Sequence, residues 1–194
     1  MAVSILRKYS FKDTDIVYVI DSETKNVGLM LLPEGMEPVE WEQKKQIVDS
    51  LVQIKLAGDI YPGAYAGGVT LRQGESTFCL TCEQQDVVSF EDRDEVITTL
   101  IDQRGYKVEH YLQLFKDSDC IETYNVFHNL SKKDTTLEMI SSFSLGGITP
   151  FTGSDAYDTL KVHRIRSVWS MEGRLESTSL EDLQLEPSWA GHAV

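Results

Sequence analysis

The feature that most constrains this chain is an alternation of apolar and polar residues over positions 106–128. Side chains of a β-strand point alternately to opposite faces, so a period of two predicts a strand with one buried face. The residues of the buried face are predicted to be Tyr106, Val108, His110, Leu112 and Leu114. After a turn at 116–119 the alternation resumes over 121–128. The pattern therefore predicts a meander of antiparallel strands.

Further strands are predicted outside this meander. Positions 15–20 are rich in β-branched and aromatic residues, and a turn-prone segment separates them from a hairpin partner at 27–32. Extended segments are also expected at 137–143, 160–169 and 175–185. Many strands with few helices favour a mainly β fold in which two sheets pack face to face.

Two segments do not show the sequence pattern of β-strands. Trp41, Ile47, Val48, Leu51 and Val52 recur at helical spacing, which predicts one short helix within 40–56. Positions 58–74 hold several glycines and Pro62, as expected of a loop or of short strands joined by tight turns.

The charge narrows the range of partners. Thirty-one acidic and 18 basic side chains give a formal charge of −13, which opposes binding to nucleic acid or to an anionic membrane surface. With 41% hydrophobic residues over 194 positions, the chain is expected to form one globular domain over 1–194. The N-terminus lacks the apolar core of a signal peptide and the three cysteines are an odd number, so a cytoplasmic location is expected.

No metal or cofactor site is predicted. Cys79 and Cys82 have the spacing of a zinc knuckle, but 77–82 has the composition of a strand, on which residues three apart face opposite ways. The four histidines lie on separate segments without a metal-ligand pattern, and no nucleophile or dinucleotide motif occurs. The acidic run 91–95 is typical of a solvated surface.

Two places combine features of a sugar site, in which an aromatic ring packs on the pyranose and a carboxylate accepts hydroxyl hydrogen bonds. Asp59 lies between glycines near Tyr61 and Tyr65, and Trp189 lies in a segment near the C-terminus. The structural alternatives are an acid that stabilises a turn for Asp59 and a core or edge aromatic for Trp189.

The segment 160–176 (LKVHRIRSVWSMEGRLE) resembles the end of the N-terminal domain of glycoside hydrolase family 36, the α-galactosidases. Two shorter stretches resemble the same family in the same order. They are Gly-Asp-x-x-x-x-Ala-Tyr at 58–65 and a strand pair followed by a serine-rich segment at 111–145. Together they extend over most of the chain.

This resemblance implies an antiparallel β-supersandwich, similar to galactose mutarotase, that precedes a catalytic (β/α)8 barrel absent from this chain. No catalytic residue is then expected here, and the chain is expected to be a truncated N-terminal domain of a homo-oligomeric enzyme. The resemblance assigns to Asp59 and Trp189 contacts with a galactoside in the active site of a neighbouring subunit.

Two other functions stay open. A free-standing carbohydrate-binding β-sandwich requires an exposed aromatic platform of its own. A mutarotase-like sugar epimerase requires a histidine pair and a carboxylate that converge inside one sandwich, and His110 and His128 are the candidate pair.

Overall fold

The computed structural model describes residues 3–36, 48–60, 74–148 and 158–184. The chain separates into two units. The first comprises Met1–Gly63 and Val69–Ile148, and the second comprises Ala64–Gly68 and Thr149–Val194. The expectation of one domain over 1–194 stays a prediction.

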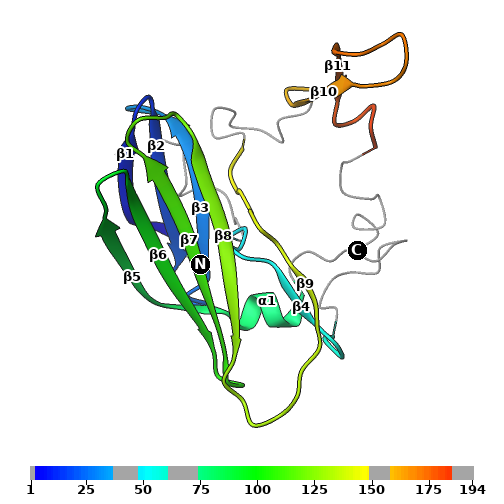
Figure 1. The fold of residues 1–194 in the computed structure, drawn as a ribbon. Helices are drawn as coiled ribbons and strands as arrows, with labels where there is room; N and C mark the ends of the chain where they lie inside the picture. Colours follow the sequence, from blue (N-terminus) through cyan, green and yellow to red (C-terminus); the bar gives the residue numbers. More distant parts are fainter. Residues whose placement is uncertain (1–2, 37–47, 61–73, 149–157, 185–194) are drawn as a thin grey trace. The chain divides into compact units, whose positions relative to one another are not determined.

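The first sheet of unit 1 has the strand order β1-β2-β3 (Figure 1). Its strands are β1 (Val3–Phe11), β2 (Thr14–Asp21) and β3 (Val27–Pro33), all antiparallel. The predicted hairpin of β2 and β3 is confirmed. Asp21 fixes the intervening turn, because its Oδ1 accepts hydrogen bonds of 2.8 Å from the amides of Glu23 and Thr24.

The second sheet is an up-and-down meander with the order β5-β6-β7-β8 (Figure 1). Its strands are β5 (Thr81–Ser89), β6 (Arg93–Asp102), β7 (Tyr106–Phe115) and β8 (Ile121–Asn129). The predicted alternation is confirmed on β7, where Val108, His110, Leu112 and Leu114 are buried and the residues between them are half-buried. β7 and β8 are the two strands that the alternation predicted.

The facing sides of these two sheets share one hydrophobic core. Ile16, Tyr18 and Leu29 of the first sheet pack in the same cluster as Val96 and Leu112 of the second. The opposite face of β2 is also buried, because Val17 and Val19 form a second cluster with Met30, Leu32 and Val48. Unit 1 is therefore built from antiparallel sheets whose apolar faces cover one another.

Two short elements lie beside this core. β4 (Ile54–Leu56) pairs with β9 (Leu137–Ile140), so the strand predicted near 137 is confirmed over part of its length. The helix α1 (Glu75–Cys79) precedes β5. No helix in the described ranges has the length and apolar character that a membrane span requires.

The helix predicted within 40–56 is wrong over its described part, since residues 48–53 are irregular and β4 follows. Tertiary hydrogen bonds replace the helical ones. The amide of Leu51 donates to the carbonyl of Val27 at 2.7 Å, and the amide of Ser141 donates to the carbonyl of Gln53 at 2.8 Å. Leu51, Val52 and Ile54 are nevertheless all buried, so core packing accounts for their apolar character. Residues 40–47 lie outside the described ranges.

The strand predicted over 77–82 is also wrong in its first half, which belongs to α1. Thr77 holds the helix against β4, since its Oγ1 donates to the Ile54 carbonyl and accepts from the Ile54 amide, both at 2.9 Å. Asn26 holds the helix end, because its Nδ2 donates to the carbonyls of Phe78 and Leu80 at 3.1 and 2.7 Å. These contacts outweigh the weak local preference of a five-residue segment.

In unit 2, β10 (Lys161–Arg166) and β11 (Arg174–Ser179) form an antiparallel hairpin. Strands were predicted at both places, and the observed ones are shorter. Ser170 and Gly173 have positive φ angles of 67° and 74°, which close the connection between the strands. The described residues are thus mainly β with several antiparallel sheets, as the sequence predicted, and their one short helix, α1, lies outside the segment predicted to be helical.

Candidate functional site

Asp59 closes a tight turn after β4. Its Oδ2 accepts a hydrogen bond of 2.9 Å from the Leu56 amide, and its own amide donates to the Leu56 carbonyl at 3.1 Å. Its Oδ1 accepts a hydrogen bond of 2.6 Å from the hydroxyl of Ser76 on α1. The side chain is 5% exposed. The turn contacts of the structural alternative are therefore present, while each carboxylate oxygen keeps a further lone pair.

Arg104, in the turn between β6 and β7, lies next to this carboxylate. Its Nη1 is 3.8 Å from Asp59 Oδ1 and 3.7 Å from Glu75 Oε1. Its Nε and Nη2 form a fork on the buried carboxylate of Asp102, at 2.9 and 2.7 Å from Oδ2. The Asp102 hydrogen bonds raise the pKa of Arg104, so the guanidinium stays a cation.

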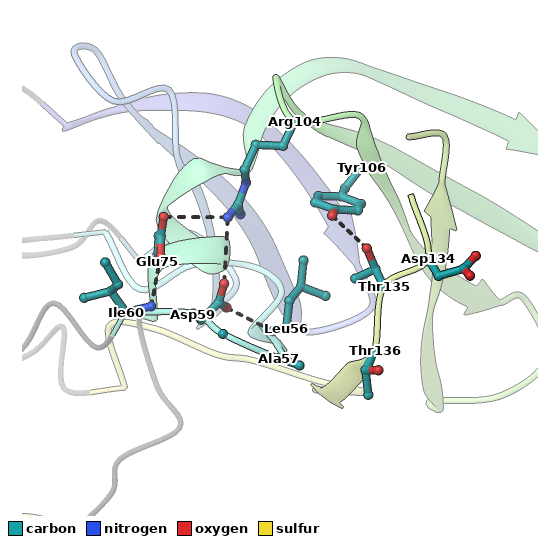
Figure 2. A pocket seen from close by; sticks show the side chains of 11 residues that line it. Leu56, Ala57, Asp59, Ile60, Glu75, Arg104, Tyr106, Asp134, Thr135 and Thr136 are labelled. Carbon is teal, nitrogen blue, oxygen red and sulfur yellow. Dashed lines mark hydrogen bonds and ion pairs between the residues drawn. The ribbon is translucent and has the colours of Figure 1, made fainter. Parts of the chain in front are cut away.

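Ser76 joins the two groups. Its hydroxyl donates to Asp59 and accepts a hydrogen bond of 2.8 Å from Arg104 Nη2. Glu75 holds the next residue of the loop, because its Oε2 accepts a 2.9 Å hydrogen bond from the Ile60 amide. Three segments that are distant in the sequence therefore meet at one charged cluster, as Figure 2 shows.

This cluster lines one side of a cavity of about 440 Å³. Opposite it lie Asp134, Thr135 and Thr136, and the hydroxyls of Thr135 and Tyr106 are 2.8 Å apart (Figure 2). The Arg104 guanidinium lies 5.6 Å from the centre of the Tyr106 ring. The cavity therefore offers carboxylate acceptors, a cationic donor, hydroxyls and an aromatic ring within one space.

The other predicted site residue, Trp189, lies outside the described residues, as do Tyr61 and Tyr65. The structure thus places Asp59 in a cavity but tests no contact between Asp59 and Trp189. The residues that accompany Asp59 there, Arg104, Glu75 and Ser76, were not predicted. In the sequence, these three residues stand out only as polar side chains next to the ends of secondary-structure elements.

The two candidate histidines lie on adjacent strands but on opposite faces of their sheet. His110 points into the core and is fully buried. In the pairing of β7 with β8, His128 lies opposite Lys107, on the outer face of the sheet. The Nε2 atom of His128 is there 2.8 Å from Glu109 Oε2. The two rings therefore do not converge as a mutarotase-like epimerase requires.

The cysteines also occupy different elements. Cys79 ends α1 and Cys82 lies in β5, so the stated reason for expecting no zinc, a shared strand, is wrong. Across the four described ranges, no group of three or more His, Cys, Asp and Glu side chains is placed to hold a metal ion.

The acidic run 91–95 divides into two environments. Glu91 and Asp92 are exposed, as predicted, and Asp92 accepts hydrogen bonds from Arg93. Glu95 differs, because it is 7% exposed and its Oε2 accepts a hydrogen bond from Gln113. The solvated-surface prediction therefore fails for Glu95.

The fold and the cavity define a mainly β protein with a polar, hydroxyl-rich site. No protein-family model matches the chain, and neither do any of the curated proteins or solved structures with which it was compared. The resemblance to glycoside hydrolase family 36 accordingly stays a prediction.

Proposed function

We propose that this chain is the non-catalytic N-terminal domain of an α-galactosidase-like glycoside hydrolase, with a galactose-mutarotase-like supersandwich fold. In this proposal a separate (β/α)8 barrel cleaves the glycosidic bond, and the chain supports that barrel, the homo-oligomer and the rim of the sugar site. Its substrate is a galactoside and its location is cytoplasmic. The observation that carries the proposal is the placement of Asp59 beside Arg104 and Glu75 in the 440 Å³ cavity.

The composition of the cavity suits a neutral, polyhydroxylated ligand. A sugar hydroxyl both donates and accepts, and the cavity supplies acceptors from Asp59 and Asp134, donors from Arg104, and hydroxyls from Thr135 and Thr136. Among the described lining residues, the three carboxylates of Asp59, Glu75 and Asp134 outnumber the one guanidinium of Arg104, which disfavours an anionic ligand. Asp59 is held from two sides by Leu56 and Ser76, so its carboxylate is oriented before a ligand arrives.

The proposal separates sugar contact from bond cleavage. Glycosidases use two carboxyl groups on either side of the scissile bond, and the resemblance places both on the barrel. The isolated chain is therefore expected to hydrolyse no chromogenic α-galactoside above background. Turnover that survives repurification would contradict this part of the proposal.

The decisive test uses the full-length enzyme. Asp59→Asn removes the charge but keeps the shape of the side chain, and it is expected to raise KM roughly tenfold with a smaller change in kcat. Trp189→Ala is expected to act in the same direction. Asp119→Asn, whose side chain is 91% exposed and which does not line the cavity, is the matched control and should leave KM unchanged. An unchanged KM for both Asp59→Asn and Trp189→Ala, at unchanged oligomeric state, would eliminate the substrate contact.

A further inference from the structure

The side of the four-stranded sheet that faces away from the core carries a stacked pair of tyrosines. Tyr111 of β7 and Tyr124 of β8 are direct partners in the strand register. Their rings lie 4.5 Å apart with an interplanar angle of 6°. The inward-pointing neighbours Leu112 and Val108 are buried, whereas Tyr124 is 42% exposed.

Tyr124 is 42% exposed, so part of its side chain is accessible to a ligand. Tyr111 lies on one side of the ring. On the other side β8 ends the sheet among the described residues, and segment 141–142 meets the β8 edge through the side chains of Thr123 and Asn125. Stacking against Tyr111 fixes the ring in one orientation. A ring that is already fixed loses little rotational freedom when a ligand packs against it.

Carboxylates flank this pair on both sides. The next outward position along β7 is Glu109, whose Oε1 accepts a 3.0 Å hydrogen bond from Lys107 and whose Oε2 accepts one of 2.8 Å from His128. The Lys107 hydrogen bond in particular holds the pKa of Glu109 below its ordinary value. On the other flank, Gln113 of β7 donates to Glu95 of β6.

We propose that this outer face is a second carbohydrate site, which binds a neutral glycan chain with one pyranose stacked on Tyr124. The apolar C–H side of a pyranose packs on an aromatic face, and the oriented, partly exposed carboxylate of Glu109 accepts a hydroxyl proton. The outer face carries Glu95, Glu109 and Glu122 together with Arg93 and Lys107, so its formal charge is negative and disfavours anionic ligands. The site is separate from the Asp59 cavity and does not depend on the function proposed for it.

Phe90 is a matched control on the same unit. It is 40% exposed, close to the 42% of Tyr124, but the Arg93 guanidinium covers its ring at 4.4 Å from the centroid. The Arg93 guanidinium therefore already covers the Phe90 ring, and none of the described contacts of Phe90 is with a carboxylate. Replacing Phe90 removes an exposed aromatic side chain that lies in the connection between β5 and β6, outside the Tyr111–Tyr124 pair.

The test is isothermal titration of the 194-residue chain with galactomannan oligosaccharides, cellohexaose and chitohexaose, and with polygalacturonate as an anionic probe. At least one neutral probe is expected to bind, and polygalacturonate is not. Tyr124→Ala should lower the affinity at least fivefold, while Tyr124→Phe and Phe90→Ala should keep it within twofold. Circular dichroism of each variant verifies that the fold is retained.

Three results would overturn the proposal. They are the absence of binding by every neutral probe at millimolar concentration, unchanged affinity in Tyr124→Ala, and an equal loss in Phe90→Ala. Asp59→Asn distinguishes this site from the cavity, because it should leave glycan affinity at Tyr124 unchanged. If Asp59→Asn abolishes the binding and Tyr124→Ala does not, the bound sugar lies at the cavity, and the second site is rejected while the proposed function stands.

Discussion

His110 makes the fold sensitive to acid, and the size of the effect follows from its surroundings. The imidazole is fully buried in the core between the two sheets, opposite Thr98 of β6. Neither ring nitrogen has a hydrogen-bond partner in the described part of the chain, and the hydroxyl of Tyr18 lacks one as well. Burial of this unpaired ring lowers its pKa from 6.5 to about 4.

The lowered pKa of His110 decides whether acid stabilises or destabilises the fold. The unfolded chain takes up a proton on His110 near pH 6.5, whereas the folded chain resists protonation until about pH 4. Stability from the neutral ring is therefore complete above about pH 6.5 and is lost as the pH falls towards 4. At about 1.36 kcal/mol per pKa unit, the full loss is roughly 3 kcal/mol, of which roughly 2 kcal/mol falls between about pH 7 and about pH 4.5.

Urea denaturation followed by circular dichroism, repeated across that pH range, measures this loss. His110→Leu keeps an apolar side chain of similar size, and His110→Gln serves as a second variant if the first packs poorly. Between about pH 7 and about pH 4.5, the wild type should lose roughly 2 kcal/mol more unfolding free energy than either variant. Carboxylates with lowered pKa values, such as Asp21, titrate in all three proteins and cancel in the difference. Parallel curves for wild type and variants would refute the reasoning.

Two further predictions concern packing and thiol reactivity. Gly28→Ala should cost roughly 1–3 kcal/mol in urea denaturation, because a Cβ there would lie 2.7 Å from the Asp49 carbonyl oxygen and 2.8 Å from Val48 Cγ1. Gly74→Ala, where a Cβ meets nothing within 4 Å, is the control and should cost less than Gly28→Ala, about 1 kcal/mol or below, because it only replaces Gly by the poorer N-cap residue Ala at α1. Cys79 is exposed as a residue, but partial burial of its thiol and then the Asp102 carboxylate raise its pKa. The thiol should therefore react slowly with iodoacetamide near neutral pH and faster as the pH rises. Peptide mass spectrometry would measure the rate, and rapid alkylation at about pH 7 would contradict it.

The strands predicted from the sequence are those with one clearly buried face or with strong β composition. β7 alternates in burial along most of its length, and β2 and β3 are rich in buried apolar residues. β1 and β5 end their sheets and leave most side chains half-buried or exposed, and they were missed as full strands. The central strand β6 was missed as well, because it is buried on both faces over part of its length and shows no clear alternation. An edge strand has neighbours on one side alone, so its sequence is less restricted by packing.

Of the described residues of the candidate site, the sequence pointed only to Asp59, which lies in a recognisable local turn pattern. Asp59 stands in a glycine-containing turn, and the turn hydrogen bonds to Leu56 are the contacts such an acid makes. Arg104 lies in another turn, and its distance of 3.8 Å from Asp59 arises because α1 packs beside both β4 and β6. No pattern near either residue encodes that approach.

The incorrect strand at 77–82 and the unpredicted site have the same cause. Ser76 reaches both Asp59 and Arg104, and Glu75 reaches Ile60, from the first turn of α1. An extended chain would send these two consecutive side chains to opposite faces, so it could not present both to the loop after β4. The helix that allows this is held by side chains from elsewhere, Thr77 on Ile54 and Asn26 on Phe78. The same long-range hydrogen bonds therefore select the helix over the strand and assemble the charged cluster around Asp59.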